Sequence, residues 1–194
     1  MITEISQLDP NKTYTYADYL TWQLQERIEL IKGKLFKMSP APSNTHQKIA
    51  TALSGIIWQF FRKSSCEVRS APFDVRLNRR KLDDQTSKTV VQPDLCVICD
   101  AEKLDERGCN GVPDLIVEIL SPGNSKKEMS DKFEVYEENG VREYWLVNPS
   151  EKNVIIYTLN EESVFIGRKP FIEDDVLSSY IFPELRIDLA EIFA

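Results

Sequence analysis

Glu118 lies inside an apolar stretch, VPDLIVEILSPGN from Val112 to Asn124, whose hydrophobic residues are typical of a strand buried on both faces. A carboxylate moved out of water is normally paired, bound to a metal or neutral. Asp94 has a comparable setting, because it follows Pro93 in VVQPDLCVI. If these two strands pair, both acids can face one pocket, where two close carboxylates repel each other. A divalent cation removes that conflict, and Mg²⁺ typically takes one or two carboxylates, so we expect a magnesium site on Asp94 and Glu118.

Lys132 is the third residue that could act in this pocket. The helix predicted over residues 125–139 has an apolar stripe, formed by Met129, Phe133 and Tyr136. Lys132 lies beside that stripe and faces the sheet, where an ammonium could orient a water molecule or stabilise developing negative charge. Taken alone, Lys132 is more typical of a snorkelling side chain, and Asp94 of a turn residue after proline. Only the mid-strand Glu118 resists such a structural explanation.

Two further residues keep two interpretations each. Glu29 falls on one arm of a predicted hairpin, where either a second metal ligand or a surface charge is consistent with the sequence. His46, the only histidine, lies on the apolar side of a predicted long helix. We expect it to be a packing residue, with a polar contact near the pocket as the alternative. A nucleophilic triad is not expected, because no suitable Ser or Cys motif accompanies His46, and the chain has no G-x-x-x-x-G-K phosphate loop.

The elements that must position these side chains follow from capping patterns, turns and periodicity. The Ser/Thr-x-x-acid pattern at Thr15–Asp18 predicts a short helix to about Gln25. Residues 27–39 predict a hairpin that turns at Lys32–Gly33. Ser43 or Asn44 can cap a long helix, whose apolar stripe consists of Ile49, Ala50, Leu53, Ile56, Ile57, Phe60 and Phe61.

The second half of the chain predicts strands around one further helix. The predicted strands cover residues 67–77, 89–99, 112–121, 141–149, 153–159 and 163–168, with polar loops at 78–88 and 100–111. A capping box at Ser125–Glu128 begins the helix, and Asn139–Gly140 ends it. This helix is long enough to be a crossover that makes the strands on either side of it parallel. The tail predicts a short strand and a terminal helical turn.

This order of elements predicts one α+β domain over residues 1–194, a mixed sheet flanked by helices. The length suits one domain with a substantial core. No apolar run approaches the ~18 residues that span a bilayer, so no membrane association is expected. The start of the chain shows no export signal, so we expect a cytoplasmic protein. Disulfides are then not expected among Cys66, Cys96, Cys99 and Cys109, and we interpret the Cys96–Cys99 pair as small buried hydrophobes.

The distribution of charge bears on nucleic-acid binding. The net charge of −7 argues against a simple electrostatic nucleic-acid binder. The charge is uneven, because residues 1–99 carry 14 basic and 10 acidic side chains (+4) and residues 100–194 carry 10 and 21 (−11). The basic clusters at Arg62–Lys63 and Arg79–Lys81 could follow a phosphate backbone, or they could be solvated surface charge.

Three motifs in this order resemble the PD-(D/E)xK nuclease superfamily: Pro93–Asp94, then VEILSPGN around Glu118, then DKFEVYEENGVREYWLVNP. More narrowly, nearly the whole chain resembles the Uma-type family of restriction endonuclease-like proteins. The resemblance implies a restriction endonuclease-like fold and a site that uses Mg²⁺, or Mn²⁺, to cleave phosphodiester bonds in DNA. A homodimer would serve to cut both strands.

The resemblance also implies roles for individual residues. The superfamily pattern places a lysine two residues after the acid, where this chain has Leu120. The Uma-type proteins place it on the following helix, which corresponds to Lys132. Asp94, Glu118 and the main-chain carbonyl of Ile119 would bind the metal, and Glu29 would be the upstream acid. Two alternatives stay open: a weakly active or inactive module that binds DNA or a protein partner, and a hydrolase of small phosphoesters.

Overall fold

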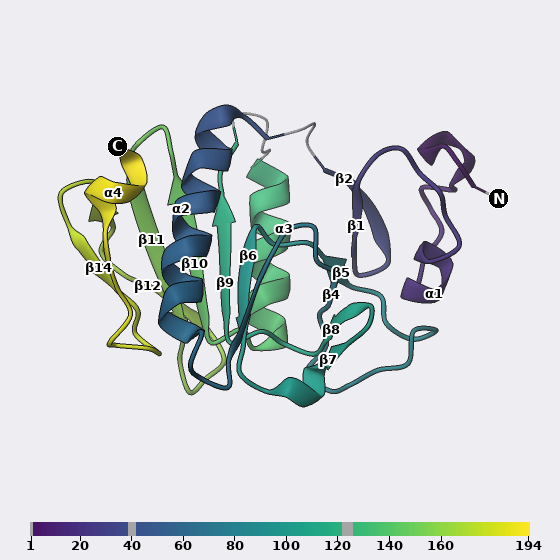
Figure 1. The fold of residues 1–194 in the computed structure, drawn as a ribbon. Coiled ribbons are helices and arrows are strands. Elements are labelled where there is room, and N and C mark those ends of the chain that lie inside the picture. Colours follow the sequence, from purple (N-terminus) through teal and green to yellow (C-terminus); the bar gives the residue numbers. More distant parts are fainter. Residues whose placement is uncertain (1, 39–41, 122–125) are drawn as a thin grey trace.

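Two mixed β-sheets form the body of the chain, and two long helices cover opposite faces of the larger sheet (Figure 1). The computed structural model describes residues 2–38, 42–121 and 126–194. The larger sheet has its main strands in the order β12 (Phe165–Gly167), β11 (Asn153–Leu159), β10 (Glu143–Asn148), β9 (Leu115–Ile119), β6 (Leu95–Ile98) and β3 (Glu67–Ser70), and β13 (Phe171–Ile172) pairs with β11. The predicted α+β class with a mixed sheet is confirmed.

Side chains of β9 alternate between the two faces of this sheet, as the period of two in a strand requires. Leu115, Val117 and Ile119 enter the core under α2 (Asn44–Phe61). Ile116 points to the opposite face, toward α3 (Lys126–Asn139). Glu118 shares this second face with Ile116, so the mid-strand carboxylate points at α3.

The two long helices begin and end where the sequence predicts. Ser43 caps α2, since its side chain accepts a hydrogen bond from the amide of His46 at 3.2 Å. The predicted stripe buries its central residues, Ile49, Leu53, Ile57 and Phe61, whereas Phe60 is exposed. Helix α3 ends at Asn139, and Gly140 follows with φ +88°, the left-handed conformation that favours glycine. The predicted capping box involves Ser125, which lies outside the described residues.

The α3 crossover makes β9 and β10 parallel, as predicted, with Glu118 level with Leu146. The last strands, β11 and β12, form the predicted antiparallel pair. The tail forms a hairpin and a short helix, β14 (Val176–Ser178), β15 (Arg186–Asp188) and α4 (Leu189–Phe193). These elements complete the α2 side of the core.

A six-stranded sheet built mainly from the first half of the chain lies beside the larger one (Figure 1). Its order is β2 (Lys34–Lys37), β1 (Ile28–Ile31), β5 (Val90–Val91), β4 (Val75–Arg76), β8 (Gly108–Asn110) and β7 (Leu104–Asp105). The β1–β2 pair is the predicted hairpin, turning at Lys32–Gly33. Short helical segments complete the chain: α1 (Tyr16–Tyr19), Ile5–Gln7 and Ala101–Lys103.

Several predicted element boundaries are wrong, each for a local reason. The predicted strand 67–77 is two strands, β3 and β4, in different sheets, and Pro72, which lacks an N–H, interrupts it. In the same way, the predicted strand 89–99 divides at Pro93 into β5 and β6. The predicted loop 100–111 contains the β7–β8 hairpin. Helix α1 ends at Tyr19 instead of about Gln25, and the chain then bridges to Ile2 through Trp22.

The cysteine prediction is also wrong in one respect, because Cys66 and Cys99 form a disulfide. Strands β3 and β6 pair antiparallel with Glu67 opposite Ile98. The next pair outward is therefore Cys66 and Cys99, and the register brings the two thiols together. Cys96 and Cys109 are free and buried, as expected of small hydrophobes.

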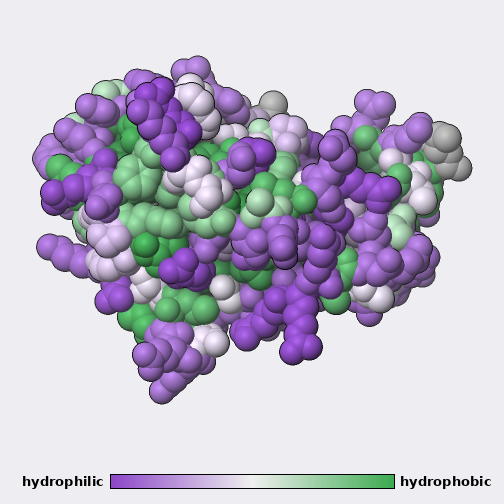
Figure 2. Space-filling view, turned by 60° about the horizontal axis from the view of Figure 1, so that its bottom comes forward, coloured by the Kyte–Doolittle hydropathy of each residue, from purple (hydrophilic) through white to green (hydrophobic). Residues whose placement is uncertain are grey.

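The surface is polar over most of the face shown in Figure 2, with hydrophobic side chains in smaller groups between hydrophilic ones. Among the described residues, no helix is long and apolar enough to cross a bilayer. The buried hydrophobic side chains of the described residues form two large cores and a smaller one near the N-terminus.

Candidate active site

Lys132 joins two acidic side chains from different sheets. Its Nζ lies 3.0 Å from Oε1 of Glu118 on β9 and 3.1 Å from Oε1 of Glu29 on β1. The Lys132 and Glu29 side chains are almost fully buried, and that of Glu118 is only 13 % exposed. A buried charge is tolerated when it is paired and hydrogen-bonded. These contacts supply the partners that the mid-strand Glu118 requires.

Tyr136 adds a second bond to the same carboxylate. It lies one turn after Lys132 on α3, and its hydroxyl is 2.5 Å from Oε1 of Glu118. Residues four apart share one face of a helix, so Lys132 and Tyr136 both reach Glu118. The sequence places Tyr136 in the apolar stripe of this helix, and its polar role is not predicted. A tyrosine four residues after the candidate lysine is the signal that could have indicated it.

Asp94 lies at the same pocket and is held by two donors. Its Oδ2 accepts a hydrogen bond from the amide of Ile119 at 2.8 Å, and it lies 3.2 Å from Nε2 of His46. The bond to Asp94 raises the pKa of His46, and the main chain of Ile119 and the charge of Glu118 act in the same direction. His46 is thus both a buried packing residue and a polar neighbour of the pocket, which combines the two predicted alternatives.

The site lies where the chain passes from one sheet to the other. Residues 92–94 join β5 of the smaller sheet to β6 of the larger sheet. The amide of Gln92 donates a hydrogen bond of 2.7 Å to Oε1 of Glu29, while Asp94 binds β9. Glu29 is 1 % exposed, so the interpretation of this residue as a surface charge is wrong.

Burial and like charges set the protonation of this cluster. Burial raises the pKa of Glu118 to about 7, and the charges of Asp94 and Glu29 add to this effect, whereas Lys132 and Tyr136 oppose it. Burial alone would lower the pKa of Lys132, but the attraction of Glu118 and Glu29 outweighs it and raises that pKa above its ordinary value. Lys132 therefore stays protonated and cannot accept a proton.

The oxygen-rich character of the pocket is compatible with a hard divalent cation. When all three acids are ionised, they carry three negative charges against the single charge of Lys132. The described contacts engage Oδ2 of Asp94 and Oε1 of Glu118, and each carboxylate has a second oxygen. Among the residues that the structure describes, no three His, Cys, Asp or Glu side chains are arranged to hold a metal. A cation here would need main-chain, water or phosphate oxygens as well, which is the mixed shell that Mg²⁺ usually takes.

Comparison with known proteins places this chain in a family. Residues 16–190, nearly the whole chain, match the Uma2 family, described as "Putative restriction endonuclease". The chain belongs to the Uma2 family. It is similar to "Uncharacterized protein slr1290" of Synechocystis sp. (strain ATCC 27184 / PCC 6803 / Kazusa), with 24 % identity over 148 residues that cover 75 % of this chain and 74 % of the relative.

A solved structure has the same fold as this Uma2 chain. It is the crystal structure described as "a putative nuclease belonging to DUF820" from Anabaena variabilis ATCC 29413. The TM-score is 0.70 at 21 % identity, and the match covers 93 % of this chain and 97 % of the other. The family resemblance and the fold expected from the sequence are confirmed.

The predicted site residues of this Uma2 chain come together in space. Asp94, Glu118, Lys132 and Glu29 are linked by contacts through the amides of Gln92 and Ile119 and through Lys132 itself. Asp114, which lies just before β9, is a nearby acid with other partners. It accepts a hydrogen bond from the amide of Cys99 and pairs with Arg142. Asp114 therefore lies at the entry to the strand, in contacts separate from this cluster.

The Arg62–Lys63 cluster is remote from this pocket, whereas the Arg79–Lys81 cluster contacts the end of α3 through Arg79. Arg62 follows the last residue of α2, whereas His46 is in its first turn. At 1.5 Å per residue, Arg62 is roughly 24 Å along the helix from His46, so the Arg62–Lys63 cluster is remote from Asp94. Arg79 donates a hydrogen bond of 2.6 Å to the carbonyl of Glu138, near the end of α3.

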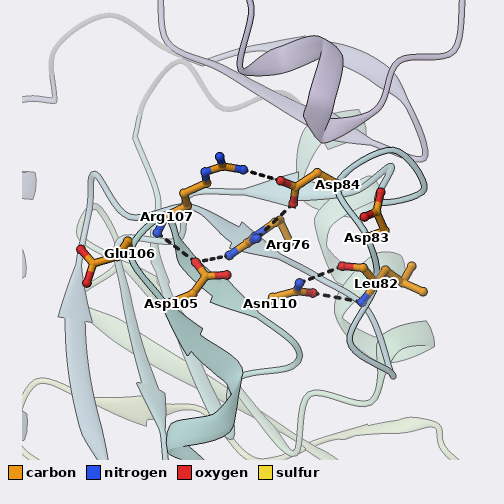
Figure 3. A pocket seen from close by; sticks show the side chains of 8 residues that line it. All are labelled: Arg76, Leu82, Asp83, Asp84, Asp105, Glu106, Arg107 and Asn110. Atoms are coloured by element: carbon orange, nitrogen blue, oxygen red, sulfur yellow. Dashed lines mark hydrogen bonds and ion pairs between the residues drawn. The ribbon is translucent and has the colours of Figure 1, made fainter.

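A separate cavity of about 380 Å³ lies near β4, and the charged side chains that line it form ion pairs with one another (Figure 3). The buried guanidinium of Arg76 pairs there with Asp84 at 3.1 Å and with Asp105 at 2.5 Å. Arg107 also pairs with Asp84, and Asn110 holds the main chain of Leu82. These ion pairs connect the loop after β4 to the β7–β8 hairpin, so the charges serve the fold.

Proposed function

We propose that this Uma2 chain is a Mg²⁺-dependent endonuclease that hydrolyses phosphodiester bonds in DNA, with Mn²⁺ as an alternative metal. One observation carries the proposal: a lysine from α3 meets an acid on each sheet beside Asp94. This combination corresponds to the PD-(D/E)xK arrangement with its lysine moved to the following helix. Membership of a family described as "Putative restriction endonuclease" supports the same activity.

Some of these residues would hold a cation, and the others would position the reactants. Asp94, Glu118 and the carbonyl of Ile119 would hold Mg²⁺, which supplies positive charge that polarises a phosphate. Lys132, kept protonated by its two acids, donates a hydrogen bond that orients the attacking water and faces the negative charge that develops on the phosphate. Glu29 anchors the ammonium of Lys132. The amide of Ile119 and the imidazole of His46 fix Asp94.

We further propose that two copies act together. One pocket contains one such cluster and would cut one strand at a time, so a homodimer would provide the second cluster for the other strand. A mass measurement in solution with and without duplex DNA tests this arrangement. A monomer that makes double-strand breaks in a single binding event would contradict it.

A cleavage assay tests the nuclease function directly. The wild-type chain should cut DNA in Mg²⁺ or Mn²⁺ but not in EDTA, and supercoiled, linear duplex and single-stranded DNA should all be offered. Asp94→Ala, Glu118→Gln and Lys132→Met should each lose at least about 100-fold of the rate, as removal of a single electrostatic catalytic group does. The control, Asp114→Asn, replaces one carboxylate oxygen outside the pocket, in a side chain as little exposed as that of Glu118 (12 % against 13 %), and should retain cleavage. Activity that survives in all three site variants would overturn the assignment.

Two observations favour the second candidate, a nuclease-fold module that binds DNA or a protein partner without cutting. Lys132 is already paired with both acids, and no three-ligand metal group exists among the described residues. Binding of DNA in EDTA that is unchanged by Mg²⁺ and by Asp94→Ala, with no cleavage in either metal, would support the module. Turnover of mononucleotide phosphoesters with no cleavage of DNA would indicate a small-molecule hydrolase instead.

A further inference from the structure

We propose that another cavity, which lies beside Glu29 and is distinct from the one near β4, binds one unstacked nucleobase of the substrate strand, and that guanine matches it best. The cavity has a volume of about 220 Å³ and lies between the end of α1 and the start of β1. Since a water molecule occupies about 30 Å³ of liquid, this volume has room for a one- or two-ring heterocycle. The proposal rests on the nuclease function proposed above and names the form of nucleic acid: a strand with an unpaired base near the bond that is cut.

Two aromatic side chains give the cavity a stacking surface. Tyr19 and Trp22 both line it and are half-buried, with ring centroids 5.9 Å apart and planes at 58°. Trp22 also packs edge-on against the buried ring of Tyr14, at 5.1 Å between centroids. This packing holds Trp22 in place before a ligand arrives. Every nucleobase presents a flat π face, and stacking on such rings tolerates any sequence.

Polar groups at the cavity are fixed in orientation by their own bonds. The Nε2 of Gln92 donates a bond of 2.8 Å to Asp74, and its Oε1 accepts bonds from Nη2 and Nε of Arg27 at 2.6 and 3.2 Å. These bonds engage two of the five N–H donors of the Arg27 guanidinium. The side chain of Arg27 is thereby held at the cavity, with further donors for a ligand.

The charges of the lining match one base better than the others. A guanidinium forms paired hydrogen bonds with O6 and N7 of guanine. The carboxylate of Glu26, also in the lining, can accept hydrogen bonds from the N–H groups of the same base. Its existing pair with Lys37, at 3.3 Å, is exposed to solvent and therefore weak. Adenine offers the guanidinium only one of these two acceptors.

The cavity adjoins the candidate active site through two residues. Arg27 precedes Glu29 by two positions, which is roughly 7 Å along an extended chain. Gln92 contributes its side chain to the cavity and its amide to Glu29, at 2.7 Å. A base held by Tyr19, Trp22 and Arg27 would therefore lie within a few nucleotides of the phosphate at Lys132.

Binding measured in EDTA tests the inference without any contribution from cleavage. Fluorescence anisotropy would compare a blunt duplex with the same duplex carrying one unpaired guanine or one unpaired adenine. We expect the guanine bulge to bind at least about fivefold tighter than the blunt duplex, in line with the value of stacking one base, and tighter than the adenine bulge. Trp22→Leu and Arg27→Gln should each remove this preference. The matched controls Trp58→Leu and Arg62→Gln, both on or next to α2 and outside the cavity, should keep it.

The outcomes separate this inference from the nuclease function. Equal binding of all three DNAs, or an unchanged preference in Arg27→Gln, would overturn the nucleobase site even if the chain cuts DNA in Mg²⁺. Equal binding of the guanine and adenine bulges would overturn the choice of guanine. A preference that depends on Arg27, without cleavage in Mg²⁺ or in Mn²⁺, would retain the base site and overturn the nuclease function. Arg27 is exposed, so its variant remains informative even if Trp22→Leu does not fold.

Discussion

The ammonium of Lys132 lies 3.0 Å from Oε1 of Glu118, which belongs to the strand that precedes its helix, and 3.1 Å from Oε1 of Glu29 on the other sheet. A single buried cation thus neutralises part of the charge of two acids that are 89 residues apart in the chain. Its removal would leave both carboxylates buried and uncompensated.

Lys132→Met should therefore reduce the free energy of unfolding in EDTA by about 3 kcal/mol or more, the usual cost of breaking a buried pair on one side. Urea denaturation followed by circular dichroism measures this change. The matched control is Lys32→Met, which breaks an exposed pair with Glu138 at 2.8 Å and should cost less than about 1 kcal/mol. Equal losses in the two variants would show that the Lys132 pair does not stabilise the fold.

Tyr136→Phe should raise the pKa of Glu118 further above about 7, because the hydroxyl of Tyr136 stabilises the ionised carboxylate through its 2.5 Å bond. A pH titration of the carboxyl carbon by nuclear magnetic resonance reports this change, which a loss of packing alone would not produce. Tyr180→Phe, at an exposed position, serves as the control and should leave the titration of Glu118 unchanged. A lower pKa in Tyr136→Phe would exclude the assigned role of the hydroxyl.

The stability of the metal-free chain should fall as the pH rises from about 4.5 to about 7, through the contribution of Glu118. Its pKa in the folded state is about 7 against an ordinary value of 4.5, so within this window the unfolded chain releases the proton and the folded chain retains it. Ionisation then favours the unfolded state, and the effect is complete above about pH 7. Urea midpoints at several pH values, compared with those of Glu118→Gln, isolate this contribution. Parallel profiles for the two proteins would contradict it.

Reduction of the Cys66–Cys99 disulfide should destabilise the chain by about 3–4 kcal/mol, because the bond closes a loop between residues that are 33 positions apart. Denaturation with and without a thiol reductant measures the loss. Mass spectrometry after alkylation without reductant should find Cys66 and Cys99 protected by the bond. Cys96→Ala, which removes a free buried thiol, should leave the effect of the reductant unchanged. Alkylation of Cys66 in the unreduced unfolded chain would contradict the pairing.

The sequence predicts the elements around the site well and the sheet boundaries poorly, for identifiable reasons. Capping residues and helical periodicity are local signals, so α2 and α3 begin and end close to their predicted positions. The division of the predicted strands at Pro72 and Pro93 depends on which sheet each half joins, and that choice is decided by contacts distant in sequence. The alternation of side chains along β9 predicts that Glu118 and Ile116 share a face, but it does not identify the helix that covers this face.

Glu143 shows the limit of inference from a buried acid. It is the first residue of strand β10 and is fully buried. Its carboxylate accepts bonds from the indole of Trp145 at 2.5 Å and from the amides of Tyr180 and Ile181 at 2.8 and 2.9 Å. It therefore anchors the tail, and burial alone does not distinguish it from Glu118. The motif around Glu118 and the lysine on the next helix made that distinction.

Glu29 and Glu118 belong to different sheets, so the geometry of the candidate site depends on how the two sheets pack together. Glu29 belongs to the smaller sheet, and Glu118 and Lys132 belong to the larger sheet and its crossover helix. A shift of one sheet against the other would separate Glu29 from the ammonium of Lys132 even if the pairing within each sheet stayed intact. If the chain is the nuclease proposed above, inactivation by heat or denaturant would precede melting, and a partner that holds the two sheets together would act as an activator.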